Sequence, residues 1–313
     1  MSEFEMPMVI VDISARRDLA AALSAALGVP QIALESRQFP DGEHYVRLLA
    51  QVSGCQVILL ADLRKPDEAI LPIIFIADLL HEMGATKVLL VVPYLAYMRQ
   101  DIRFKPGEAI SSRSFARLLS QHVDALLTID PHLHRYHALS EIYSIPALAM
   151  SSVELIAAWI REHVDKPILI GPDAESSQWV EAVARLAGAP ATVLHKTRHG
   201  DRAVEVSAPP LDDGVDHTPI LVDDIVSSGH TLLETLHHLQ RGSWSPAVCI
   251  AVHGLFAEDS YAQLKAAGTR TIVTCNTVQH ASNGIDITSV LVQGIRQLSA
   301  PKEYHDGELA AKL

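Results

Sequence analysis

Two adjacent carboxylates and a hydroxyl-rich turn lie close together in the second half of the chain. The acids are Asp223 and Asp224, and the turn consists of Ser227, Ser228, Gly229, His230 and Thr231. Carboxylates accept hydrogen bonds from vicinal hydroxyls, and backbone N–H groups and hydroxyl side chains at the start of a helix bind anions. The segment therefore predicts a sugar-phosphate site, with the acids on the ribose and the turn on the phosphate.

The elements on either side favour this prediction. Residues 219–222 are an apolar run typical of a buried strand, and leucines at helical spacing follow the turn until Gly242. In the alternative interpretation, the two acids merely end the strand, and Ser228 or Thr231 caps the helix. The complete sequence of strand, acid pair, turn and helix favours the binding site over capping alone.

Two further segments bring cations. Arg99 and Arg103, with Gln100 and Asp101 between them, follow an apolar strand pattern and suit bidentate contacts to phosphate, with surface salt bridges as the alternative.

Lys196 and Arg198 lie one residue apart in the second basic segment, which we expect to be a loop that ends at Gly200. Paired charges of this kind suit a phosphoryl group whose negative charge is redistributed in a transition state. A solvated turn is the alternative for this segment.

Three histidines, His132, His134 and His137, follow Asp130 closely. Neither a cysteine nor a helical His-Glu-x-x-His spacing accompanies them, so a zinc site is disfavoured. A carboxylate and one imidazole near magnesium-bound phosphates fit the segment better. Magnesium takes one or two protein ligands and completes its shell with water and phosphate oxygens.

Phe39, Asp41 and Glu43 form a turn sequence together with Pro40 and Gly42. One interpretation is an ordinary structural turn. The other is recognition of a nucleotide base, by stacking on the ring and hydrogen bonding to the acids. We expect this turn, like the other segments above, at the carboxyl ends of parallel strands, where such sheets bind ligands.

Strand and helix patterns alternate along the chain. Strands are expected over residues 8–13, 57–61, 88–92, 125–129, 168–170, 192–194, 219–222, 248–252 and 271–274. Helices are expected over residues 18–27, 66–84, 112–121, 153–163, 178–186 and 259–267, besides the one after the turn. This alternation predicts an α/β fold of two mainly parallel sheets flanked by helices, joined near residues 149–152.

Composition restricts the classes of function. The 313 residues suffice for two domains with cores of their own. The 37 acidic and 25 basic residues give a net charge of −12, which disfavours nucleic acid and anionic membrane surfaces as partners. Cys55, Cys249 and Cys275 show no paired spacing and are expected as free thiols. With no basic segment before the first apolar run, we expect a cytoplasmic protein.

Taken in order, the motifs resemble one family, the ribose-phosphate pyrophosphokinases, also called phosphoribosyl diphosphate (PRPP) synthetases. The motifs are FPDGE, YMRQD, Asp130-Pro131-His132, Pro172-Asp173, the segment of Lys196 and Arg198, and VDDIVSSGHT. The last one alone resembles the PRPP-binding motif of the phosphoribosyltransferase fold. The PGEAIS stretch and Ser227 resemble archaeal-type members of the family. The resemblance extends over nearly the whole chain, to the region of Asp286.

The resemblance implies two similar phosphoribosyltransferase-like domains. Residues 1–149 would contribute to ATP binding and residues 150–313 would bind ribose 5-phosphate and PRPP, with the extreme C-terminus packing back on the first domain. The implied reaction transfers the β,γ-diphosphoryl group of ATP to the 1-hydroxyl of ribose 5-phosphate, giving PRPP and AMP. Mg²⁺ is the implied cofactor, and a homo-oligomer, either a dimer or a hexamer, the implied assembly. The alternatives are a non-catalytic regulatory homologue and a phosphoribosyltransferase that consumes PRPP.

The resemblance also implies a role for each motif residue. The implied ATP-binding residues are Phe39, Asp41, Glu43, Arg99, Gln100, Asp101 and His132. Ribose 5-phosphate would be bound by Asp223, Asp224, Ser227, Ser228, Gly229, His230 and Thr231. Lys196 and Arg198 would be catalytic, and His132 and Asp173 would lie at the metal. The chain departs from the family pattern at three positions, which are His230, Glu175 and Ser176.

Overall fold

The structure, a computed structural model, contains two parallel β-sheets of the same design. It describes residues 7–14, 16–171, 177–193, 217–241 and 244–300, and the backbone alone of residues 195–199 and 203–207. In the first sheet the order is β2 (Gln31–Ile32), β1 (Met8–Asp12), β5 (Gln56–Leu60), β6 (Lys87–Val91), β7 (Ala125–Ile129) and β8 (Ala147–Met150). All of its described neighbours pair in parallel.

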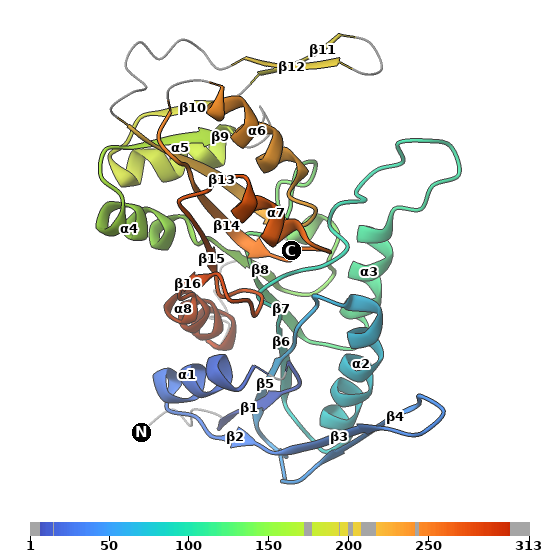
Figure 1. Cartoon of the computed structure of the whole chain (residues 1–313). Coiled ribbons are helices and arrows are strands. Elements are labelled where there is room, and N and C mark those ends of the chain that lie inside the picture. Colours follow the sequence, from blue (N-terminus) through green and yellow to red (C-terminus); the bar gives the residue numbers. More distant parts are fainter. Residues whose placement is uncertain are drawn as a thin grey trace, which may run out of the picture.

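The second sheet repeats this arrangement. Its order is β10 (Ala191–Val193), β9 (Pro167–Gly171), β13 (Thr218–Val226), β14 (Val248–Gly254), β15 (Thr271–Cys275) and β16 (Asn283–Ile285). Two antiparallel pairs stand apart from the sheets, β3 (Leu34–Gln38) with β4 (His44–Leu48) and β11 (His195–His199) with β12 (Ala203–Ser207). Each pair follows the strand at the edge of its sheet, and Figure 1 shows the two pairs at opposite ends of the molecule.

Helices cover both faces of each sheet, as the nearly continuous apolar strands require. In β6, for example, Val88 and Leu90 face one core while Leu89 and Val91 face another. On the first sheet, α2 (Pro66–Glu82) and α3 (Ser111–Ser120) cover one face and α1 (Arg17–Leu27) covers the other (Figure 1). On the second sheet, the covering helices are α4 (Val153–His163), α5 (Ser177–Ala187), α6 (His230–Gln240) and α7 (Ser260–Ala266).

The last described helix, α8 (Thr288–Ser299), crosses between the halves. It follows the second sheet in sequence but packs on α1, β7 and β8 of the first half. The backbone of Gly294 lies against β7, since a Cβ atom there would be 2.5 Å from Cδ1 of Leu127. Buried residues from both sheets, together with α8, form one continuous hydrophobic cluster. The halves are therefore joined by a shared core as well as by the chain.

The predicted fold class is confirmed, and each predicted strand and helix coincides with one in the structure, although β13 extends beyond the predicted residues 219–222. The residues that end one predicted strand and one predicted helix, Leu194 and Gly242, lie outside the described residues. The division at residues 149 and 150 stays a prediction, and β8 ends at Met150, just before α4. The predicted packing of the extreme C-terminus concerns residues 301–313, which also lie outside the described part.

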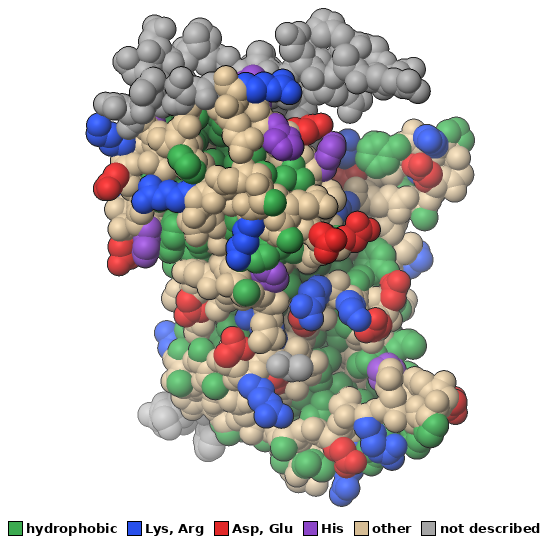
Figure 2. All heavy atoms as spheres, in the orientation of Figure 1, with side chains coloured by type: hydrophobic (Ala, Val, Ile, Leu, Met, Phe, Trp, Pro, Cys, Tyr) green, Lys and Arg blue, Asp and Glu red, His purple; other side chains and the backbone are tan. Residues whose placement is uncertain are grey.

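The three cysteines are free thiols, as predicted. Burial raises the pKa of Cys249 and of Cys275 to about 12, so both stay protonated at neutral pH. Among the described residues, no helix combines the length and apolar character that a bilayer span requires. On the face drawn in Figure 2, Lys and Arg side chains are interspersed with Asp and Glu side chains over both halves.

Candidate active site

A pocket surrounds the turn between β13 and α6. It has a volume of about 160 Å³, and nine of its lining residues belong to the second half: Asp223, Ile225, Val226, Ser227, Ser228, Gly229, His230, Thr231 and Leu232. Gly229 has φ 68° and ψ 5°, a left-handed conformation that favours glycine. No side chain caps the first turn of α6, so its backbone N–H groups are available to a ligand. The predicted strand, turn and helix are thus arranged as a candidate anion site.

The segment that follows β14 packs against the turn and binds it through hydrogen bonds. The carbonyl oxygen of Ser227 accepts hydrogen bonds from the backbone N–H of Ala257, at 3.0 Å, and from Oγ of Ser260, at 2.9 Å. A Cβ atom at Gly229 would lie 3.4 Å from Cδ1 of Leu264, so α7 is packed closely under the turn. These contacts hold the turn in the shape that leaves its N–H groups open.

Asp223 and Asp224 lie within β13, whereas the sequence placed both of them after the strand. The strand continues to Val226 because its last residues pair with His253 and Gly254 of β14. Successive strand residues project to opposite sides, so the two carboxylates have different surroundings. Asp223 lines the pocket, and Oδ2 of Asp224 lies 2.6 Å from Nδ1 of His132.

The contact between His132 and Asp224 joins the two halves at the site. Burial by itself raises the pKa of the Asp224 carboxyl, but the hydrogen bond from His132 and its charge outweigh burial and lower the pKa to about 2. The carboxylate is therefore ionised at neutral pH. An ionised carboxylate beside the anion pocket suits a ligand that carries a divalent cation or a sugar hydroxyl.

His134 completes a three-residue cluster with these two side chains. The possible ligand atoms of His132, His134 and Asp224 all lie within 4.8 Å of one another, and the two imidazole rings are 3.8 Å apart. Neither His134 nor Asp224 is predicted as a magnesium ligand from the sequence. The i, i+2 spacing of His132 and His134 was the available signal, but the approach of Asp224 depends on the fold. His137 is exposed, and its backbone N–H binds Glu141.

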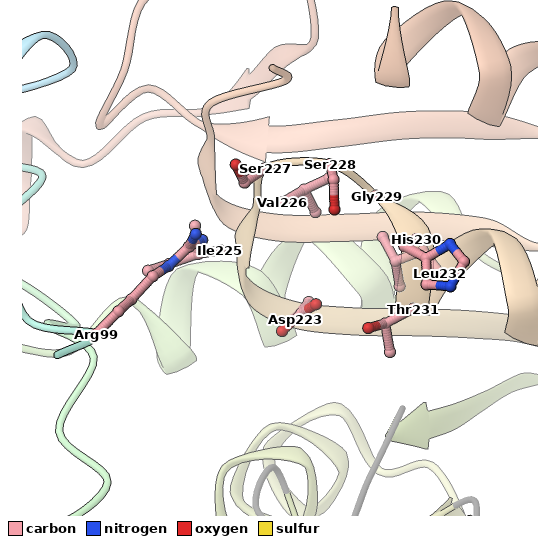
Figure 3. Close-up of a pocket in the computed structure, with 10 residues that line it drawn as sticks. All are labelled: Arg99, Asp223, Ile225, Val226, Ser227, Ser228, Gly229, His230, Thr231 and Leu232. Atoms are coloured by element: carbon pink, nitrogen blue, oxygen red, sulfur yellow. The ribbon is translucent and has the colours of Figure 1, made fainter. Parts of the chain in front are cut away.

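The segment of Arg99 approaches the pocket from the first half. Arg99 is exposed and lines the pocket, and Figure 3 shows its side chain reaching toward the turn from a separate segment. Gln100 is half-buried beside it. Asp101 is only 3% exposed, and both of its carboxylate oxygens accept hydrogen bonds from Nη1 of Arg135, at 2.9 and 3.1 Å. This ion pair anchors the segment of Arg99 at Asp101, and it already supplies both oxygens of the Asp101 carboxylate with a hydrogen bond.

Phe39, Asp41 and Glu43 lie at the tip of the antiparallel hairpin β3–β4, where we had expected the end of a parallel strand. The backbone N–H of Phe39 binds the carbonyl of Glu43, which closes the turn. Figure 1 places this hairpin at the far end of the first half from α6. FPDGE thus forms a hairpin turn, and within one chain its residues do not line the pocket, so the recognition of a base stays a prediction.

Of the remaining predicted residues, some lie outside the described part of the chain. Lys196 and Arg198 belong to β11, so the expected loop is instead a strand paired with β12. A strand forms because residues 195–199 have a partner segment in register, which the local sequence did not reveal. Asp173, Glu175 and Ser176 lie outside the described residues. His230 is exposed, and its Nε2 lies 3.1 Å from Oε1 of Glu234, one turn further along α6.

Two family models match the chain in succession. The N-terminal domain of ribose phosphate pyrophosphokinase matches residues 8–122, and the phosphoribosyl transferase domain matches residues 138–288. The two matches correspond to the two halves of the structure and include both sides of the pocket.

Curated relatives match over nearly their full length. The ribose-phosphate pyrophosphokinase of Methanothermobacter thermautotrophicus is 31% identical over 286 residues, which cover 90% of this chain and 98% of the relative. That of Methanopyrus kandleri is 30% identical over 295 residues, covering 93% and 100%. The expected likeness to archaeal members is thus confirmed.

A solved structure supports the same assignment. The phosphoribosylpyrophosphate synthetase from Mycobacterium smegmatis superposes with a TM-score of 0.83 at 25% identity, covering 93% of this chain and 98% of that one. The fold, the motif order and the relatives agree with one another. The chain belongs to the ribose-phosphate pyrophosphokinase family.

Proposed function

We propose that this chain is a ribose-phosphate diphosphokinase. In the reaction, the 1-hydroxyl oxygen of ribose 5-phosphate bonds to the β-phosphorus of ATP, the bond between that phosphorus and the bridging α,β-oxygen breaks, and the hydroxyl proton is released. The products are PRPP and AMP. The observation that carries the proposal is the anion pocket at α6, which Arg99 of the other half also lines, together with the contact of His132 with Asp224 next to it, in a chain of this family.

The second half binds the sugar phosphate in this proposal. The N–H groups at the start of α6 and the hydroxyls of Ser228 and Thr231 bind the 5-phosphate, and Figure 3 shows these side chains around the turn. Asp223 lines the same pocket and accepts hydrogen bonds from the ribose hydroxyls. Because the pocket is small and polar, it suits a monosaccharide phosphate.

The first half binds the nucleotide. Arg99, exposed at the edge of the pocket, pairs with phosphate oxygens of ATP, and Gln100 supports it. Asp101 orients this segment through Arg135, and His132 lies where the phosphates of ATP would meet Asp224. Holding both substrates in reacting orientation lowers the entropic part of the barrier.

Phe39, Asp41 and Glu43 bind the adenine of a neighbouring subunit in a homo-oligomer. Two observations support this part of the proposal. Phe39 is 39% exposed although it is a large apolar residue, and its hairpin lies far from the pocket of its own chain (Figure 1). The guanidinium of Arg37 lies over the ring of Phe39, 4.6 Å from the ring centroid. This cation–π contact holds the ring in place for stacking against a base.

The donor set at the site fits a magnesium ion that is held largely by substrate phosphates. Asp224 supplies one ionised carboxylate, and magnesium takes few protein ligands. We propose that Asp224 and His132 lie at this ion, with Asp173 as a further ligand. When bound, the ion offsets negative charge on the transferring diphosphoryl group. Lys196 and Arg198, from β11, stabilise the same charge.

The test is a product assay on the purified chain with ATP, Mg²⁺ and ribose 5-phosphate, followed by phosphorus NMR. Equal amounts of AMP and PRPP are expected, and omission of Mg²⁺ should abolish both. Nucleotide binding without turnover would instead support a non-catalytic homologue. Consumption of added PRPP with a free base would support a phosphoribosyltransferase, and family membership favours neither alternative.

A further inference from the structure

His253 is a fully buried imidazole that lies outside the pocket. It belongs to β14 and has an exposed fraction of 0%. Its Nδ1 lies 2.9 Å from Oγ1 of Thr277, and its Nε2 lies 3.2 Å from the backbone oxygen of Asp130. Its ring also contacts that of Tyr94, with centroids 5.0 Å apart. One side chain of the second half thus contacts two segments of the first half.

Both contacted segments lead to the active site. Tyr94 lies five residues before Arg99 in the segment that reaches the pocket, and Asp130 lies two residues before His132. Asp130 has φ 33°, a backbone conformation that non-glycine residues adopt only when their surroundings impose it. Ser152 holds the side chain of Asp130, donating to Oδ2 from its N–H at 2.7 Å and from its hydroxyl at 2.6 Å. His253 holds the backbone of the same residue from the other side.

The contact with Asp130 requires one tautomer of His253. Burial lowers its pKa to about 4, although Asp130 and Asp224 act in the opposite direction, so the ring is neutral and carries one N–H. A carbonyl oxygen only accepts, so His253 holds the backbone of Asp130 only when this hydrogen lies on Nε2. Nδ1 then accepts, and the one hydroxyl hydrogen of Thr277 is shared between Nδ1, 2.9 Å from Oγ1, and the carbonyl oxygen of Val252, 2.7 Å from Oγ1. Thr277 thus orients the ring in this tautomer.

We propose that His253 is a positioning residue for nucleotide binding, which fixes the segments of Arg99 and His132 against the sugar-phosphate strand. The inference depends on the proposed function only for its kinetic readout. Because the side chain of His253 contacts the first-half segments, and only its backbone pairs with the pocket strand, its loss should affect the nucleotide more than the sugar phosphate. Small displacements of positioned groups have large effects on rate.

Two substitutions separate the hydrogen bond from the volume of the side chain. His253→Leu fills the space without a donor, whereas His253→Gln places an amide N–H close to the position of Nε2. For His253→Leu we expect the KM for ATP to rise about tenfold and kcat to fall about tenfold, with the KM for ribose 5-phosphate within about twofold of wild type. His253→Gln should recover most of both effects.

A second pair of substitutions tests whether Thr277 orients the ring of His253. Thr277→Val removes the hydroxyl that contacts Nδ1, and Thr277→Ser keeps it. The valine variant should show the same split between the two KM values at a smaller scale, about threefold, while the serine variant stays near wild type. This pair also serves if His253→Leu does not fold, because the imidazole itself is unchanged.

Nitrogen NMR of ¹⁵N-histidine-labelled protein provides a readout that needs no turnover. The His253 signal, assigned by its loss in His253→Gln, should show the Nε2–H tautomer in wild type and a mixture in Thr277→Val. Calorimetry with a non-hydrolysable ATP analogue should give the same order of affinities as the KM values. If wild type formed no PRPP, the proposed function would fail, yet these two measurements would still test His253.

Three results would overturn the proposal. One is an Nδ1–H tautomer in wild type. Another is equal nucleotide affinity in the leucine and glutamine variants at equal thermal stability. The third is a rise confined to the KM for ribose 5-phosphate, which would place the influence of His253 on the other side of the site.

Discussion

The two halves share a topology but differ at the same structural position. The third strand in sheet order is β5 in the first half and β13 in the second, and each leads into a helix, α2 or α6. After β13 the helix begins behind Gly229, with no acid in its first turn. After β5 it begins behind Lys65, with Pro66 at its start and Asp67 and Glu68 in its first turn.

These differences decide which helix can bind phosphate. Proline removes one of the N–H donors, and acids in the first turn occupy the position where a helix stabilises negative charge. Neither helix start has a side-chain cap, but the proline and the two acids make the start of α2 unfavourable for an anion, whereas the first turn of α6 contains no acid. The fold supplies two equivalent positions, and we propose that the residues of the turn make the one at α6 a phosphate site.

The antiparallel pairs differ in the same way. Each follows the edge strand of its half, yet β3–β4 presents an aromatic ring and two acids at its tip, while β11 carries Lys196 and Arg198. Lys196→Ala should lower kcat by about 10² or more with little change in the KM for ribose 5-phosphate, because its charge acts in the transition state. Arg47→Ala in β4, which removes only a surface contact to Glu35, should leave kcat unchanged. A loss confined to KM in Lys196→Ala would refute the catalytic role.

Left-handed glycines occur in both halves, which allows a matched comparison. Gly229 and Gly28 have φ 68° and 70°, so Gly229→Ala and Gly28→Ala impose a similar backbone strain. We expect Gly229→Ala to lower kcat/KM for ribose 5-phosphate about 10²-fold, since it distorts the anion site. Gly28→Ala, at the end of α1, should reduce thermal stability alone. Equal kinetic losses in the two variants would contradict the role of the turn.

Substitution of the acids near the ends of β5 and β13 should affect the KM for ribose 5-phosphate differently. Asp223→Asn is expected to raise the KM for ribose 5-phosphate about tenfold, because an amide replaces an acceptor of ribose hydroxyls. Asp62 follows β5 and accepts from the backbone N–H of Arg64 at 2.7 Å, so Asp62→Asn should leave this KM unchanged. Steady-state kinetics with ribose 5-phosphate varied at saturating ATP measure both.

The free energy of unfolding should depend on pH through His253, a residue of the second half. The pKa of His253 in the folded protein is about 4, below the value of 6.5 for an exposed histidine. The unfolded chain therefore binds a proton that the folded chain does not, and stability is lost as the pH falls from 6.5 toward 4. The loss attributable to this group is on the order of 3 kcal/mol. Denaturant unfolding at pH 7 and pH 4.5 should show a smaller decrease for His253→Gln, and parallel decreases would contradict this assignment.

The smallest effect is expected at α2. Glu68 lies in the first turn and 3.0 Å from Nζ of Lys65, with both side chains exposed. Glu68→Gln should reduce the free energy of unfolding by about 0.3–1 kcal/mol and leave catalysis unchanged. A measurable change in either KM would mean that the start of α2 takes part in substrate binding after all.

Local patterns sufficed for nine of the twelve strands of the two sheets and for the turn at α6, because both depend on periodicity and on residues adjacent in sequence, but they missed the short edge strands β2, β8 and β16. They did not reveal β3–β4, whose strands are largely polar, or α8, which contains Gly294 and several β-branched residues. The approach of His132 to Asp224 links residues 92 positions apart, and the burial of Asp101 requires Arg135. Such contacts are set by tertiary packing, which a single sequence does not display.

Helix α8 limits how this chain can be divided or exchanged. It carries residues of the second half into the core of the first, with Gly294 against Leu127 and Met150. A gene split after codon 150 would yield a first product with an apolar sheet face that α1 covers only in part, which would aggregate unless the second product were made in the same cell. Although the halves are alike in topology, each depends on the other for its packing. Recombination between related genes must therefore preserve the match between α8 and the sheet that it covers.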